Sequence, residues 1–89
     1  MRHEIRWHEK AVKDLKKLDR VKALDLVEKV NIRLAEDPAA QGTPLKGLFK
    51  GLYRYRVGDY RVIYAIDESE NTILILKIGD RKSVYRLHR

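Results

Sequence analysis

The chain has 89 residues, room for one domain with one modest core, and 44% of them are apolar, an ordinary share for a globular protein. It contains no cysteine, which excludes disulfides, thiolate zinc sites and cysteine nucleophiles. Twenty Lys and Arg against thirteen Asp and Glu give a net charge of +7, which favours a polyanionic partner: RNA, DNA, an acidic protein or an anionic membrane. The alternative is a soluble domain with a charged coat, and the placement of the cations decides between the two.

The sequence pattern contains no targeting or membrane-spanning segment. The longest apolar stretch, residues 72–76, is far too short to cross a bilayer, and the charged N-terminus does not look like a signal peptide. We therefore expect a cytoplasmic protein.

The first part of the chain predicts one strand and two helices. Residues 1–7 alternate charged and apolar side chains, with Ile5 and Trp7 on a buried side. From about His8 the period lengthens to that of a helix with an apolar face: Ala11, Leu15 and Leu18. After a break near Arg20, a second amphipathic helix follows, which ends before Pro38; its apolar positions are Ala23, Leu26, Val27, Val30 and Leu34. The short connection predicts an antiparallel helical hairpin.

The remainder predicts a loop and three strands. Residues 37–51 hold both prolines and three of the five glycines, and we expect an ordered loop there. Residues 52–57, 60–66 and 72–78 are rich in aromatic and β-branched side chains. Together these elements predict one α+β domain over residues 1–89, in the order β-α-α-β-β-β. It has a small, mainly antiparallel sheet with a helical hairpin packed on one face.

A two-residue turn at Gly58-Asp59 fixes which side chains share a side of this sheet, because glycine at the first central position suits type II′ geometry. The turn places Arg56 opposite Arg61, and alternate residues along a strand share a side. One side then carries Tyr55, Val57, Tyr60, Val62 and Tyr64. The other side carries Arg54, Arg56 and Arg61.

A second turn at residues 67–71 extends the register to the last strand. With Ile66 opposite Thr72, the predicted pairs on the apolar side are Tyr64 with Leu74, Val62 with Leu76, and Tyr60 with Ile78. The same register sets Arg61 opposite Lys77, and Arg81 has the parity of Lys77. Like charges placed opposite each other destabilise a sheet, so a face of cations without a carboxylate predicts an anion-binding groove. The alternative is a solvated face whose long stems cover apolar sheet surface.

Two stretches of the sequence resemble the RelE/ParE toxin superfamily. Residues 51–64, GLYRYRVGDYRVIY, are similar to the central hairpin of that superfamily, and residues 78–86, IGDRKSVYR, to its closing segment. The helical hairpin and the Asp37-Pro38 break agree, so the likeness covers nearly the whole chain. The resemblance implies the toxin of a type II toxin–antitoxin system. For the RelE type it implies an endoribonuclease that cuts mRNA on the ribosome and is restrained by a cognate antitoxin wrapped around it.

The resemblance also implies roles for particular residues. Arg54 and Arg56 match two basic residues beside the scissile phosphate, and Arg61 matches a basic residue that binds phosphate. Arg81 matches the arginine that protonates the leaving oxygen or stabilises its charge. Tyr85 matches a tyrosine that stacks on a nucleotide and helps to orient the reacting group.

The implied reaction is attack by a ribose 2′-hydroxyl on the adjacent phosphate, with release of a 5′-hydroxyl fragment. It needs no metal and no cofactor, only alignment, charge stabilisation and proton transfer. The chain departs from the pattern at Arg54 and Arg56, where the best-studied members carry lysines, because an arginine does not give up its proton. The general base is therefore open between Tyr85, Asp80 and His88, and slow cleavage without a base is a further alternative.

The sequence also offers other candidate residues and functions. The histidines His3, His8 and His88 have no ligand spacing, so we predict no metal site. Trp7 and the tyrosines of the apolar side are expected in the core. The rival to the nuclease is a ParE-like toxin that inhibits DNA gyrase without catalysis, and a third reading is an RNA-binding relative without chemistry. The pair of Arg81 and Tyr85 favours the nuclease, because ParE-like chains generally lack it. The outer groove of the helical hairpin is a candidate seat for the antitoxin.

Overall fold

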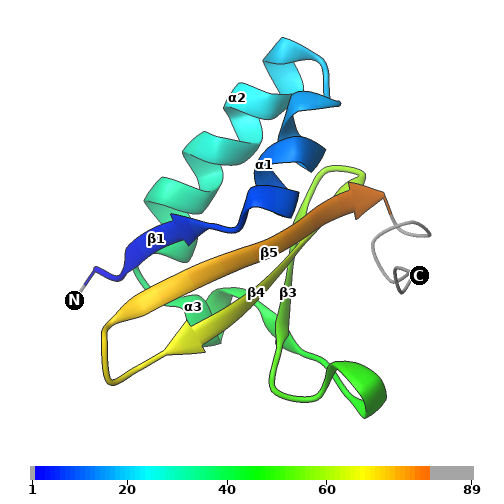
Figure 1. The fold of residues 1–89 in the computed structure, drawn as a ribbon. Helices are drawn as coiled ribbons and strands as arrows, with labels where there is room; N and C mark the ends of the chain where they lie inside the picture. Colours follow the sequence, from blue (N-terminus) through cyan, green and yellow to red (C-terminus); the bar gives the residue numbers. More distant parts are fainter. Residues whose placement is uncertain (1, 81–89) are drawn as a thin grey trace.

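The computed structural model describes residues 2–80, which form a five-stranded sheet in the order β1-β5-β4-β3-β2 (Figure 1). The strands are β1 (Glu4–Trp7), β2 (Thr43–Pro44), β3 (Tyr53–Val57), β4 (Tyr60–Asp67) and β5 (Thr72–Asp80). The β1 strand runs parallel to β5, and the other neighbours are antiparallel. The predicted α+β class and mainly antiparallel sheet are confirmed.

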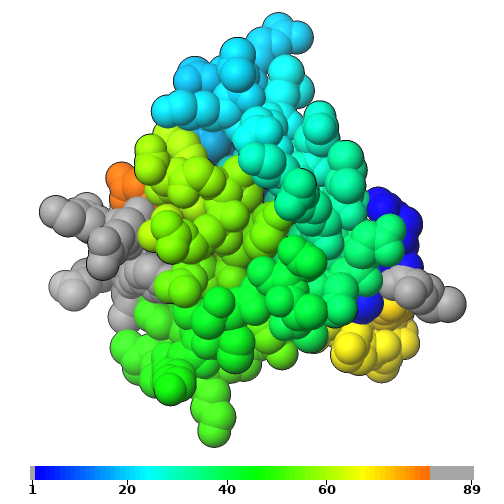
Figure 2. All heavy atoms as spheres, turned by 180° about the vertical axis from the view of Figure 1, so that it is seen from behind, coloured from blue at the N-terminus to red at the C-terminus, as the bar shows by residue number. Residues whose placement is uncertain are grey.

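Two helices form the predicted hairpin over one face of the sheet. They are α1 (Glu9–Lys16) and α2 (Arg20–Lys29), and they lie side by side in Figure 1. The side chains of His8 and Asp19 cap their N-termini by accepting the N–H groups of Lys10 and Lys22. Figure 2 shows the same molecule from behind, where α2 (cyan) meets the segment around the β3–β4 turn (yellow-green).

The end of α2 holds a feature that the sequence did not predict. Residues Val30–Leu34 form a π-helical turn, η1, closed by the N–H of Ala35, which donates to the carbonyl of Val30 at 3.1 Å. The wider turn leaves both Leu34 and Ala35 with no exposed surface. An uninterrupted α-helix would direct two consecutive residues to different faces.

The core lies between the helices and the sheet. Its buried members are Ala11, Leu26, Val30, Leu34, Tyr55, Val57, Val62, Tyr64, Ile73, Ile75 and Ile78. Ile5 and Trp7 pack against this cluster, as predicted for the buried side of β1. The tyrosines of the hairpin face the core rather than solvent, which also agrees with the prediction.

The prediction of a plain loop at residues 37–51 was wrong in part. The segment contains a short helix α3 (Pro38–Gln41), the edge strand β2 and a 3-10 turn η2 (Gly47–Phe49). Asp37 caps α3 by accepting the N–H of Ala40 at 3.3 Å, and Pro38 occupies its first turn. Elements this short show no hydrophobic periodicity in the sequence, so only their capping residues could have predicted them.

The tyrosine at position 64 ties α3 to the sheet. Its hydroxyl donates to the carbonyl of Pro38 at 2.6 Å, and its ring stacks on Tyr53 with centroids 5.5 Å apart. A Cβ at Gly42 would lie 1.8 Å from that hydroxyl and 3.0 Å from the carbonyl oxygen of Arg54, so this position admits only glycine. Burial raises the pKa of the Tyr64 phenol well above its usual value.

The register of β3 and β4 is the predicted one, with Arg56 opposite Arg61 and Arg54 opposite Ile63. Gly58 has a φ of 60° while Asp59 keeps a negative φ, which agrees with a type II′ turn.

The register of β4 and β5 differs from the prediction. Ile66 lies opposite Ile73 instead of Thr72, and a β-bulge at Leu76 shifts the pairing beyond it. The core-facing residues of β5 are therefore Ile73, Ile75 and Ile78, and the predicted Leu74 and Leu76 are not among them.

Candidate nucleic-acid interface

The sheet has one face that α1 and α2 do not cover, which we call the open face. The register places two rows of side chains across it. One row runs Arg54, Ile63, Lys77, and the next runs Arg56, Arg61, Gly79. Neighbouring strands are about 4.8 Å apart, so Arg56 and Arg61 are direct cross-strand neighbours, whereas Arg54 and Lys77 lie on either side of Ile63, about 10 Å apart. We call Arg54, Arg56, Arg61 and Lys77 the cationic cluster.

Lys77 does not pair with the residue that the sequence predicted. It lies opposite Ile63 and not opposite Arg61, because the bulge at Leu76 inserts one extra residue into β5. The predicted pairing was one residue off near the turn, which alone would put Lys77 on the core side. The bulge shifts the pairing by one more residue, so the side chain of Lys77 still lies on the open face. The position opposite Arg61 is taken by Gly79, which adds no side chain beside the guanidinium.

Arg61 is the most unusual member of the cluster. Its residue surface is only 8% exposed, and it is the one buried charged residue found among residues 2–80. No ion pair joins Arg54, Arg56 or Arg61 to a carboxylate within the described part of the chain. The Nε of Arg54 is also buried without a hydrogen-bond partner. Buried cations are normally paired, so this arrangement leaves donors free for an anion.

Arginines elsewhere in the molecule behave differently. Arg2 contacts Glu36 at 3.3 Å, and Arg6 contacts Glu4 at 3.2 Å. The lysines of α1 are exposed, which is typical of a solvated helix face. The missing carboxylate is therefore a property of Arg54, Arg56 and Arg61 and not of every arginine in residues 2–80.

The far end of the open face has the opposite character. A shallow groove of about 440 Å³ is lined there by apolar and acidic residues together with Arg6 and Thr72. Hydrogen bonds from the Ser69 side chain and from the N–H of Glu70 hold the pKa of the Asp67 carboxyl below its usual value, so this rim keeps a negative charge. The open face is therefore negative at this end and positive at the cationic cluster.

A smaller pocket of about 220 Å³ lies between α2 and the β3–β4 turn, on the side seen in Figure 2. Its lining mixes Lys22 with Asp25 and Asp59, and the Nζ of Lys22 stands 5.7 Å from the centre of the Tyr60 ring. The mixed charge makes it a poorer anion site than the cationic cluster.

The structure brings together only some of the predicted site residues. Arg81, Tyr85 and His88 lie outside the described residues. Asp80 ends β5 opposite Tyr60, whose strand position faces the helices, so the register does not bring this carboxylate onto the open face. Ile63, which is 4% exposed between Arg54 and Lys77, was not singled out from the sequence, although its parity in β4 already placed it there.

Two negative findings apply to residues 2–80. They contain no group of three or more His, Asp or Glu side chains arranged to hold a metal ion. None of their helices is both long enough and apolar enough to cross a membrane.

Known proteins match this chain over most of its length. Residues 5–85 match the family described as the ParE toxin of type II toxin–antitoxin system, parDE. Toxin RelE of Mycobacterium tuberculosis (strain ATCC 25618 / H37Rv) is 38% identical over 78 residues, which cover 88% of this chain and 80% of that protein. Toxin RelG of the same organism is 33% identical over 86 residues, which cover 97% of this chain and 99% of that protein.

Solved structures agree with these relatives. A chain of the toxin–antitoxin complex RelBE2 of M. tuberculosis matches with a TM-score of 0.87 and 31% identity, with 91% of this chain and 93% of that chain covered. A chain of the archaeal RelE–RelB complex from Pyrococcus horikoshii OT3 gives 0.75 and 32%, with 93% and 99% covered. The chain belongs to the RelE/ParE family, the toxins of type II toxin–antitoxin systems.

Proposed function

We propose that this toxin is a ribosome-dependent endoribonuclease that cleaves mRNA and thereby inhibits translation. The observation that carries the proposal is Arg61, a buried guanidinium that, like Arg54 and Arg56 beside it, forms no ion pair with a carboxylate within residues 2–80. Such a charge destabilises the free protein and gains its counterion only when an anion binds. The relatives named Toxin RelE and Toxin RelG support the RelE type over a ParE-like gyrase inhibitor.

The cluster suits one task of phosphodiester cleavage in particular. Attack of the 2′-hydroxyl on its own phosphate builds negative charge on the phosphate oxygens, and a guanidinium fork offers them two parallel hydrogen bonds. In this proposal Arg61 holds the phosphate, and Arg54 and Arg56 stabilise the charge from the neighbouring strand. Arg81 and Tyr85 follow β5 in the sequence and are proposed, as the family resemblance implies, to assist the leaving oxygen and to orient the nucleotide.

The arginines of the cationic cluster cannot serve as the general base. Arginine does not lose its proton near neutral pH, and Lys77 is the only member that could. Asp80 does not share the open face. We therefore propose that alignment and charge stabilisation supply most of the rate, which predicts slower cleavage than a matched lysine-bearing relative achieves.

The partners follow from the same family. The solved structures cited above are complexes with RelB antitoxins, and we propose that a cognate antitoxin restrains this chain as well. The ribosome and its mRNA are the proposed targets, since the cluster lies on an open sheet face that can meet a single strand. Binding should weaken with salt, by a log–log slope of about −0.7 for each phosphate neutralised.

The test is primer extension on a defined mRNA translated in a purified system, with and without the protein. New 5′ ends at decoding-site positions, which require ribosomes and disappear with Arg61→Ala or Arg81→Ala, would support the proposal. Arg33→Ala is the matched control, because it removes the same charge from an exposed position on η1. Intact mRNA with folded protein in excess over ribosomes would overturn the proposal, and a gyrase supercoiling assay would then test the rival.

A further inference from the structure

The edge of β5 that faces away from β4 is paired with a strand, β1, over only its first half. The β1 strand pairs with β5 only as far as Trp7 opposite Ile75, and the N–H of His8 then donates to the carbonyl of Ile75 at 2.8 Å. Beyond this point β5 contacts α1, which lies beside it in Figure 1. A buried main-chain donor on that edge needs a partner other than a strand.

A carboxylate of α1 is this partner. The N–H of Ile78 donates to Oδ2 of Asp14 at 3.0 Å in a partly buried contact. Ile78 itself is only 3% exposed, so water is a poor substitute there. A hydrogen bond to an ionised carboxylate is stronger than one between neutral groups, and this one fixes the main chain of β5 at a single residue.

That residue stands at the point where the sheet is irregular. Ile78 follows the bulge at Leu76, and bulges bend a strand and redirect its side chains. Its two neighbours are Lys77, opposite Ile63, and Gly79, opposite Arg61. The residue that Asp14 holds therefore lies between the two β5 positions that complete both rows of the cationic cluster.

We propose that Asp14 is a positioning residue for the cationic cluster. By holding the N–H of Ile78 it keeps β5 at one distance and twist relative to β4, so that Lys77 and Arg61 meet phosphate oxygens in a fixed geometry. Asp14 lies on the helix side and contacts no substrate. The inference rests on the proposed function for the identity of the ligand, and an error of about 1 Å in such a site lowers the rate markedly.

The test compares three variants. Asp14→Ala removes the acceptor, and Asp14→Asn keeps a carbonyl oxygen in its place. Asp19→Ala is the matched control, because it also removes one carboxylate that accepts a backbone N–H, at 2.9 Å from Lys22, and changes the net charge equally. Each variant is first shown to be folded by its unfolding transition, and amide hydrogen exchange is measured at Ile78.

Two activities are then measured. The first is single-turnover cleavage of mRNA on saturating ribosomes, together with the ribosome concentration at half-saturation. We expect Asp14→Ala to lower the rate about tenfold with half-saturation unchanged, Asp14→Asn to recover most of the rate, and Asp19→Ala to have no effect. The second is binding of a non-cleavable 2′-O-methyl single-stranded RNA, which Asp14→Ala should weaken about threefold, because the cations are no longer preorganised.

The outcomes separate the two proposals. If the wild type cleaves while the Asp14 and Asp19 variants match each other in rate and RNA affinity, the positioning role is wrong and the nuclease stands. If the wild type leaves mRNA intact, the nuclease is wrong. RNA affinity then decides the role of Asp14, which stands if only Asp14→Ala weakens binding and falls if both alanine variants bind alike.

Discussion

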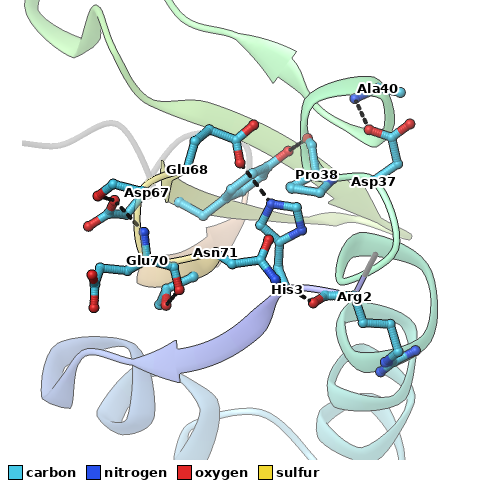
Figure 3. Close-up of polar contacts among 12 residues, drawn as sticks. Arg2, His3, Asp37, Pro38, Ala40, Asp67, Glu68, Glu70 and Asn71 are labelled. Carbon is cyan, nitrogen blue, oxygen red and sulfur yellow. Dashed lines mark hydrogen bonds and ion pairs between the residues drawn. The ribbon is translucent and has the colours of Figure 1, made fainter.

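The charged residues at the two ends of β4 differ in whether they have partners. At one end Arg56 and Arg61 face each other in the cationic cluster. At the other end the β4–β5 turn meets the N-terminal segment in a group of paired polar residues that we call the clasp: Arg2, His3, Glu36, Glu68 and Asn71. Within the clasp, Nε2 of His3 lies 2.9 Å from Glu68, and the Asn71 side chain donates to the carbonyl of Arg2 at 2.8 Å (Figure 3).

The difference shows what each set of charges does. The clasp joins segments far apart in the sequence, and its contacts stabilise the fold because Arg2 meets Glu36 and Nε2 of His3 meets Glu68, although Nδ1 of His3 is buried without a hydrogen-bond partner. The arginines of the cationic cluster bring no such gain, and their mutual repulsion opposes folding. Retaining them is consistent with a site whose ligand supplies the missing negative charge, at a cost in stability.

The largest effect should come from packing at Gly42, where the end of α3 meets the Tyr64 side chain. Gly42→Ala places a methyl group 1.8 Å from the Tyr64 hydroxyl, which is itself locked by its bond to Pro38. We expect a loss of about 3 kcal/mol in the free energy of unfolding, since overpacking forces the buried ring to move. Urea unfolding followed by circular dichroism measures it. A variant as stable as the wild type would show that α3 can shift freely from the sheet.

A smaller loss is expected from Tyr64→Phe. The variant leaves the buried carbonyl of Pro38 without its donor, which costs about 2 kcal/mol at neutral pH. Because burial raises the pKa of Tyr64, its contribution is complete below the unfolded phenol's pKa of about 10 and is lost as the pH rises above it. The gap in unfolding free energy between wild type and variant should therefore shrink from pH 8 to pH 11. A constant gap would contradict this.

At the other end of β4 we expect a substitution to stabilise the protein instead of destabilising it. Arg61→Met replaces a buried, unpaired guanidinium by an apolar side chain of similar length. We expect the variant to gain roughly 1 kcal/mol in stability, because the desolvation cost disappears, and to lose mRNA cleavage. Thermal unfolding and primer extension measure the two effects on one preparation. A destabilised Arg61→Met would show that the arginine holds the fold and would remove the contrast with the clasp.

The sequence predicted the cationic face because a two-residue turn fixes register. Gly58-Asp59 leaves no choice for the pairing of β3 and β4, so the side of Arg54, Arg56 and Arg61 followed from counting. The turn before β5 is longer, and Ile73 to Leu76 are all apolar, so period-two alternation gave no means of placing them. The predicted register of β4 and β5 was wrong by one residue near the turn. The bulge at Leu76 shifts the pairing again, so Lys77 lies on the open face as predicted, although its partner is Ile63 and not Arg61.

The chemistry of the site was predictable only in its residue types. Arg61 could be placed on the open face from the sequence, but its burial depends on the folded chain as a whole. The contact of Asp14 with Ile78 joins residues 64 positions apart through a backbone donor, which leaves no trace in the pattern of side chains. Short elements such as α3 were missed for a related reason, since their stability comes from capping and from Tyr64 rather than from an apolar stripe.

The smallest effect should come from the clasp itself, through the pair of Arg2 and Glu36. Both side chains are more than half exposed, at 56% and 60%, so solvent screens their attraction. A double-mutant cycle of Arg2→Ala and Glu36→Ala should give a coupling of about 0.5 kcal/mol that fades in 1 M salt, with cleavage unchanged in all three variants. Because Arg2→Ala removes the same charge as Arg61→Ala, their comparison separates net charge from position. Equal losses of cleavage in the two variants would mean that the toxin needs only its overall positive charge, and the distinction between paired and unpaired arginines would have no functional meaning.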